Sequence, residues 1–92
     1  MTMRQAIRIH GGDNVAVALQ PLAAGAEVVL GGARVLTRSD IPRGHKLALG
    51  EMGPGEPVIK YGFPIGRATR RINAGDWVHT HNLGTALDQD VE

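Results

Sequence analysis

Four short segments repeat one arrangement of apolar and polar positions, with a glycine midway between two apolar residues. They are LAAGAEV (22–28), IPRGHKL (41–47), MGPGEPV (52–58) and INAGDWV (72–78). A glycine so placed is typical of a tight turn that needs a positive φ angle. We expect the first apolar residue to anchor each turn and the last to start a strand. The unequal intervals between the glycines argue against a solenoid.

Stretches with strand character lie between these turns. AIRIH (6–10) alternates apolar and polar positions, and Gly31–Gly32 between two apolar runs predicts a hairpin. Further strand candidates are PVIKYG (57–62), IGRATRRI (65–72) and WVHTHNL (77–83).

Residues 13–22, DNVAVALQPL, are ambiguous. Asp13 could cap a short helix, whereas Val15, Val17 and Leu19 alternate as they would in a strand. We expect a helical turn or a short helix here.

These patterns predict one mostly β domain over residues 1–92, built of short strands with glycine turns and at most a short helix. We expect its core to span about residues 6–83 and the acidic tail, 84–92, to be frayed. A chain of 92 residues has a thin core, so a pocket shared with another chain is favoured.

Composition narrows the classes of function. With 42% hydrophobic and 21% charged residues and a net charge of +1, the chain needs neither a nucleic-acid nor a membrane partner. Its aromatic residues are too few for a base-stacking platform. The absence of cysteine excludes disulfides, cysteine-ligated metals and thiol catalysis. Without a signal-peptide pattern or a membrane-spanning run, a cytoplasmic protein is expected.

The pair His79 and His81 is the first candidate for chemistry. On a strand, residues two apart point to the same side, so the two imidazoles would share one face. Such a pair could bind a divalent metal or act as a base with a helper. The alternative is the polar face of an edge strand. Further ligands could come from a partner chain, or from His10, His45, Asp76 or Asn82.

Two other stretches could bind a ligand. His45 and Lys46 follow a turn glycine, and an imidazole with an ammonium group suits a carboxylate. In VIKYGFPIG (58–66), Lys60 and Tyr61 would point to opposite faces of a strand. The glycines and proline that follow predict an irregular path open to a ligand. The alternatives are a solvated turn and a plain surface loop, respectively. No phosphate-loop, dinucleotide or nucleophile-elbow motif is present.

Four stretches, in order, resemble the N-terminal domain of the altronate/galactarate dehydratase (UxaA) family. They are DNVAVAL, DIPRGHKLAL, GEPVIKYGFPIGRA and INAGDWVHTHNL, and the resemblance covers roughly Ile7 to Leu83. It implies an SAF domain with the β-clip fold. Because this domain is often fused to a larger catalytic part, it also implies a separate small subunit or an excised domain. The small subunit of sulfolactate sulfo-lyase is similar as well.

The resemblance implies a hydro-lyase that dehydrates a sugar acid to a 2-keto-3-deoxy acid. In this view the chain completes the active site of a larger catalytic subunit and is inactive alone. Fe²⁺ or Mn²⁺ is implied for the assembled enzyme. The candidate residues are His79, His81 and Lys60 for catalysis, His79 and His81 for the metal, and His45, Lys46, Tyr61 and Asn82 for substrate binding.

Two other functions stay open at this stage. One is the small subunit of a sulfolactate sulfo-lyase, and the other is a non-catalytic module for carbohydrate or acid binding or for oligomerisation, including self-association. A nucleic-acid-binding barrel is disfavoured by the charge and the aromatic content.

Overall fold

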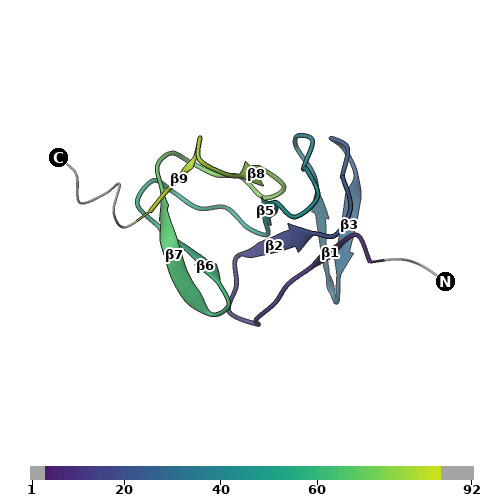
Figure 1. The fold of residues 1–92 in the computed structure, drawn as a ribbon, viewed down its shortest axis with the longest axis horizontal. Helices are drawn as coiled ribbons and strands as arrows, with labels where there is room; N and C mark the ends of the chain where they lie inside the picture. Colours follow the sequence, from purple (N-terminus) through teal and green to yellow (C-terminus); the bar gives the residue numbers. More distant parts are fainter. Residues whose placement is uncertain (1–3, 86–92) are drawn as a thin grey trace.

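The computed structural model describes residues 4–85 and forms three small antiparallel sheets (Figure 1). Within this range there is no helix, and therefore none that could cross a membrane. The expectation of a mostly β fold is confirmed. Most of the acidic tail, residues 86–92, lies outside the described part of the chain.

The sheets have the strand orders β1-β2-β5-β8, β3-β4 and β6-β7-β9. The strands are β1 (Ala6–Ile7), β2 (Val15–Ala18), β3 (Glu27–Leu30), β4 (Ala33–Leu36), β5 (Lys46–Ala48), β6 (Pro57–Lys60), β7 (Phe63–Ala68), β8 (Trp77–Val78) and β9 (Leu83–Gly84).

The four predicted glycine turns are all present. Their glycines have positive φ angles: 84° at Gly25, 81° at Gly44, 87° at Gly55 and 89° at Gly75. In each turn the N–H of the residue after the glycine donates to the carbonyl of the residue two positions before the glycine, with N···O distances of 2.9–3.1 Å. The apolar anchors are buried and form two antiparallel bridges, Leu22 with Ile41 and Met52 with Ile72.

The chain forms two similar units, residues 22–48 and 52–78, each with a turn, a hairpin, a second turn and a strand. Each unit has its own buried cluster of apolar side chains. The strands that end the two units, β5 and β8, pair with each other. Leu47 lies opposite Trp77 and packs in the first cluster, whereas Ala48 and Val78 pack in the second.

The hairpin around Gly31–Gly32 is confirmed as β3–β4. A second hairpin, β6–β7, turns at Tyr61–Gly62, where φ is 57° and 76°. Two successive residues with positive φ match the strand twist in a two-residue hairpin. The irregular path expected after Tyr61 is present as a bulge in β7, because Val58 faces Gly66 and Ile59 faces Pro64, which leaves Ile65 as the extra residue. The expectation that Tyr61 lies on a strand face is wrong, because Tyr61 lies in the turn.

The expected helix within residues 13–22 is also wrong, because Val15–Ala18 form β2 between β1 and β5. The alternating apolar residues gain two pairing partners there, which a short isolated helix lacks. Asp13 caps no helix. Its buried carboxylate accepts hydrogen bonds from the N–H groups of Gly62 at 2.7 Å and of His10 and Tyr61 at 3.1 Å. Asp13 thus holds the β6–β7 turn against the start of the chain.

Asp13 should make stability depend on pH. Burial alone would raise the pKa of this carboxyl group, but the N–H groups of Gly62, His10 and Tyr61 hold the pKa below its ordinary value of 3.8. The carboxylate therefore contributes stability above pH 3.8, and this contribution is lost as the pH falls through the lowered folded-state pKa.

We expect Asp13→Asn to lower the urea midpoint at pH 7, because an amide nitrogen then faces backbone donors. The difference from the wild-type chain should shrink as the pH falls below 3.8. A difference that stays constant between pH 7 and pH 3 would contradict this role.

Candidate functional site

Three histidines gather around the only tryptophan of the chain. The ring of His79 stacks on Trp77 with a centroid distance of 5.3 Å and an interplanar angle of 6°. His81 contacts the same indole at 5.3 Å and His45 at 5.6 Å, both tilted. The ring centroids of His45 and His79 lie 4.8 Å apart. We call these four residues the imidazole cluster.

The turn after Val78 differs from the expected strand. Strand β8 ends at Val78, and residues 79–82 form a turn in which the N–H of Leu83 donates to the carbonyl of His79 at 2.8 Å. The expectation that His79 and His81 share one strand face is therefore wrong. The indole of Trp77, rather than the alternation of a strand, brings both imidazoles together.

Asn82 fixes this turn from within. Its side chain is 3% exposed, accepts from the N–H of His79 at 2.9 Å and donates to the carbonyl of Trp77 at 2.8 Å. The amide oxygen and one amide hydrogen of Asn82 therefore both bond to backbone groups. Such side-chain bonds compete with the backbone bonds that would continue a β strand. The structure thus gives Asn82 a positioning role in the cluster, whereas its predicted contact with substrate stays a prediction.

We expect Asn82→Ala to cost about 1–3 kcal/mol of stability, because two partly buried backbone groups lose their partner. It should also change the fluorescence of Trp77, since the turn holds His79 on the indole. Asn14→Ala is a matched control, because Asn14 likewise bridges backbone groups, at Pro57 and Ile59. Equal fluorescence changes in the two variants would contradict the local role of Asn82.

One hydrogen bond sets the tautomer of His45. The indole N–H of Trp77 donates to Nδ1 of His45 at 3.1 Å, so Nδ1 acts as the acceptor. In the neutral ring the proton must then be on Nε2, which can donate to an incoming oxygen atom. His45 and His79 are half-buried, and His81 is exposed. The cluster is thus fixed on one side and open on the other.

The predicted lysines lie apart from Trp77: Lys46 is on the opposite face of its sheet, and Lys60 is in β6 of another sheet. Lys46 and Leu47 are successive in β5 and point to opposite faces, and Leu47 lies opposite Trp77. Burial lowers the pKa of Lys46, and the charge of Lys60 lowers it further, so the two ammonium groups act on each other. The ammonium group of Lys60 also lies 5.1 Å from the centre of the Tyr61 ring.

The predicted site residues therefore fall into two groups, the histidines at Trp77 and the lysine pair with Tyr61. Trp77 itself was missed as a site residue. The available signal was its position two residues before His79, since residues two apart on a strand point to the same face.

A metal needs more ligands than this cluster offers. Among residues 4–85, no three side chains of His, Asp or Glu are placed to hold a metal ion. Catalytic metal sites commonly take three protein ligands, and here His79 packs flat on the indole. The described residues do not fit a complete metal site, so we derive no catalytic step through a metal.

Comparison with known proteins agrees with this architecture. The family model described as the altronate/galactarate dehydratase SAF domain matches residues 4–86. Over 83 residues the chain is 53% identical to altronate dehydratase of Escherichia coli (strain K12), covering 90% of this chain and 17% of that protein. It is 40% identical to altronate dehydratase of Bacillus subtilis (strain 168), covering 92% of this chain and 17% of that protein.

A smaller relative matches as well. Over 52 residues the chain is 44% identical to (2R)-sulfolactate sulfo-lyase subunit alpha of Paracoccus pantotrophus, covering 56% of this chain and 78% of that subunit. The chain spans about 17% of the length of each of the two altronate dehydratases. With its strand sheets, glycine turns and matched residues, the chain belongs to the altronate/galactarate dehydratase SAF domain family.

Proposed function

We propose that this chain supplies one part of the active site of a lyase that dehydrates a sugar acid to a 2-keto-3-deoxy acid. A larger catalytic chain provides the remainder. The observation that carries the proposal is the imidazole cluster, in which three histidines meet at Trp77 with one side open. The similarity to two altronate dehydratases supports this reaction class.

The chemistry of such a lyase needs groups that this chain holds. A proton next to the substrate carboxylate must be removed by a base, and an acid must assist the departing hydroxyl group. Imidazoles serve both roles near neutral pH, and we assign His79 and His81 to them. His45 can donate from Nε2 to a substrate oxygen, because Trp77 occupies Nδ1.

The lysine pair suits the anionic part of the substrate. Two neighbouring ammonium groups repel each other, and a carboxylate bound between or beside them offsets this repulsion. We therefore propose Lys46 and Lys60 as carboxylate-binding groups, with Tyr61 as a hydroxyl donor, and keep a catalytic role for Lys60. Because these groups lie apart from the histidines at Trp77, one substrate molecule need not contact both.

A divalent ion, Fe²⁺ or Mn²⁺, is proposed for the assembled enzyme, with most of its ligands on the larger chain. A bound ion would supply Lewis-acid stabilisation of negative charge on the substrate.

Reconstitution tests the proposal. We expect the isolated chain to show no dehydration of altronate or galactarate and the larger chain alone to show little. Mixing the two at equal concentrations should restore turnover, measured as the formation of the 2-keto-3-deoxy acid. Unchanged turnover of the larger chain after addition of this chain would contradict a contribution to the active site.

A second candidate function is the small subunit of a sulfolactate sulfo-lyase. It is supported by the match to subunit alpha from Paracoccus pantotrophus, which covers 78% of that subunit. In that reaction sulfolactate loses sulfite and yields pyruvate, so the same reconstituted complex assayed with both substrates distinguishes the two lyases.

If replacing the histidines leaves turnover unchanged but weakens ligand binding or assembly, the chain is a non-catalytic module.

A further inference from the structure

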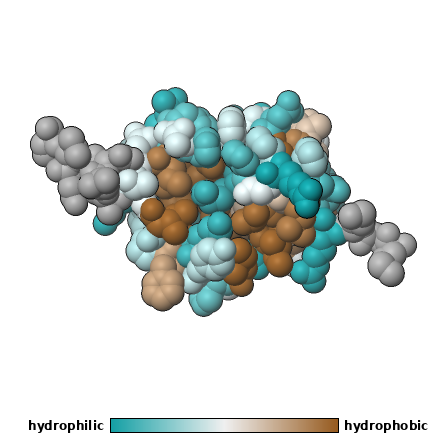
Figure 2. All heavy atoms as spheres, in the orientation of Figure 1, coloured by the Kyte–Doolittle hydropathy of each residue, from teal (hydrophilic) through white to brown (hydrophobic). Residues whose placement is uncertain are grey.

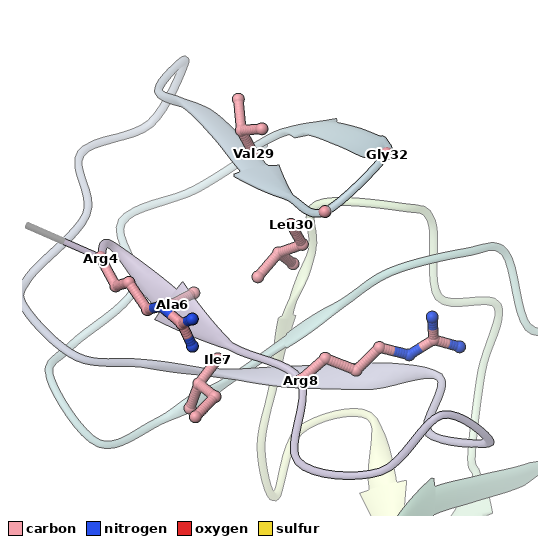
Figure 3. A pocket seen from close by; sticks show the side chains of 8 residues that line it. Arg4, Ala6, Ile7, Arg8, Val29, Leu30 and Gly32 are labelled. Carbon is pink, nitrogen blue, oxygen red and sulfur yellow. The ribbon is translucent and has the colours of Figure 1, made fainter. Parts of the chain in front are cut away.

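A groove of about 440 Å³ lies at the end of the molecule away from β9 (Figure 1, Figure 3). It is bordered on one side by β1 and on the other by β3 with the Gly31–Gly32 turn, and Leu30 points into the space between them (Figure 3). The lining residues are Arg4, Ala6, Ile7, Arg8, Val29, Leu30, Gly31 and Gly32. None of them belongs to the imidazole cluster or to the lysine pair.

Among the described residues 4–85, the groove lies between two strand edges that have no strand partner on that side. Within this range β1 pairs only with β2, and β3 pairs only with β4. The N–H and C=O of Ala18 bond to His45 and Gly44, so in the facing pair Ala18–Ala6 neither residue bonds the other. The backbone groups of Ala6 must then point away from β2, toward the groove.

The same argument holds for β3. The N–H of Thr37 donates to the carbonyl of Ala26 at 2.9 Å, which makes that facing pair a hydrogen-bonded one. Bonded and non-bonded pairs alternate along an antiparallel ladder, so Val29, three residues on, belongs to a non-bonded pair with Arg34. Its N–H and C=O also point away from the hairpin. Both edges thus present backbone donors and acceptors to an extended segment.

The charge at this groove is positive. Arg4 and Arg8 both extend from the chain at β1 (Figure 3), and both side chains are exposed. Arg8 donates from Nε to the carbonyl of Asp13 at 3.0 Å, which leaves its two terminal nitrogens for a ligand. Within residues 4–85 neither guanidinium group forms an ion pair, whereas Arg34 pairs with Glu27. The groove therefore suits an extended peptide segment that carries carboxylates.

We propose that the groove binds residues 86–92, ALDQDVE, of a second copy of this chain by strand addition. As an extended strand, this segment would place Asp88, Asp90 and Glu92 on one face and Leu87 and Val91 on the other. The acidic face matches the unpaired arginines, and the apolar face matches Leu30, which points into the groove (Figure 3). Backbone bonds to the free edges supply affinity, as in other strand additions.

The donor of the segment is a second copy because of where the strands lie. Strand β9, which leads toward this segment, is at the opposite end of the molecule from β1 and β3 (Figure 1). Segment and groove are different surfaces, so the contact is head-to-tail rather than self-complementary. This inference is independent of the proposed lyase function.

Peptide binding tests the groove. The receptor is the full chain carrying Asp88→Asn, Asp90→Asn and Glu92→Gln, and the probe is a fluorescein-labelled peptide of residues 84–92. We expect Arg4→Gln with Arg8→Gln to weaken binding about five- to tenfold, as two exposed ion pairs allow. The control pair Arg43→Gln with Arg70→Gln, exposed elsewhere, should leave binding unchanged. Equal binding by all three receptors would overturn the proposal.

Two further measurements test the mode of binding. In amide NMR spectra the peptide should shift Ala6 and Val29, and shifts that spare both residues would overturn strand addition. In sedimentation experiments the average mass of the wild-type chain should rise with protein concentration. The tail variant should remain a monomer at every concentration. A wild-type chain that stays monomeric would overturn the assignment to a second copy.

Discussion

Replacing Gly75 with alanine is expected to destabilise the domain by about 3–5 kcal/mol. Two effects add at this position. The φ angle of 89° is in a region that side chains rarely adopt, which costs about 1–2 kcal/mol. An added Cβ would also lie 1.9 Å from the carbonyl oxygen of Leu36, a backbone atom that cannot rotate away. The free energy of unfolding of a domain is typically about 5–15 kcal/mol, so the variant loses a large part of its stability.

Gly55→Ala is the matched control for this variant. Gly55 has nearly the same φ angle, 87°, but an added Cβ there meets nothing within 4 Å. We expect it to cost only the conformational part, about 1–2 kcal/mol. Urea denaturation of both variants measures the difference. Equal losses would mean that the close approach to Leu36 contributes nothing.

The close approach at Gly75 also has a place in the architecture. Its N–H donates to Ala48 at 2.8 Å, and its carbonyl accepts from the N–H of Arg38 at 3.0 Å. The turn therefore joins β5 and the end of the first hairpin just before β8 begins. A loss of packing here should displace Trp77 and, with it, the imidazole cluster.

The turns of the fold could be predicted because their cause is local. A glycine with apolar residues three positions away on either side specifies a positive φ and two buried anchors, and Ile41 and Ile72 are fully buried as expected. The Gly31–Gly32 hairpin has the same kind of local cause.

The elements that were wrongly predicted depend on distant parts of the chain. Val15–Ala18 form a strand because β1 and β5 pair with them, and no pattern within the segment reveals those partners. The turn after Val78 depends on where the side chain of Asn82 finds its hydrogen bonds. A polar residue that bonds backbone groups can end a strand without a glycine or proline to mark it.

The site could be predicted only in part. His79 and His81 are close in sequence, so a common location was expected, and both contact the indole of Trp77. His45 is 32 residues from Trp77, and only the pairing of β5 with β8 brings the two rings together. The same pairing puts Lys46 on the other face of the sheet, a separation that adjacency in sequence conceals.

Replacing His79 and His81 with alanine should lower the turnover of the assembled lyase at least a hundredfold, the scale of acid–base catalysis by positioned side chains. The larger chain should still bind this variant, because the two imidazoles lie on the indole and are not in the buried core. Urea denaturation of the variant checks that the domain remains folded.

The most direct test compares this variant with His10→Ala in the reconstituted enzyme. His10 is exposed, and its ring lies over Gly62, away from the contacts of Trp77. The account predicts that kcat/KM falls at least about a hundredfold for His79→Ala with His81→Ala and stays within about twofold for His10→Ala. Wild-type kcat/KM in the double variant, with the complex intact, would contradict a catalytic role for the imidazole cluster.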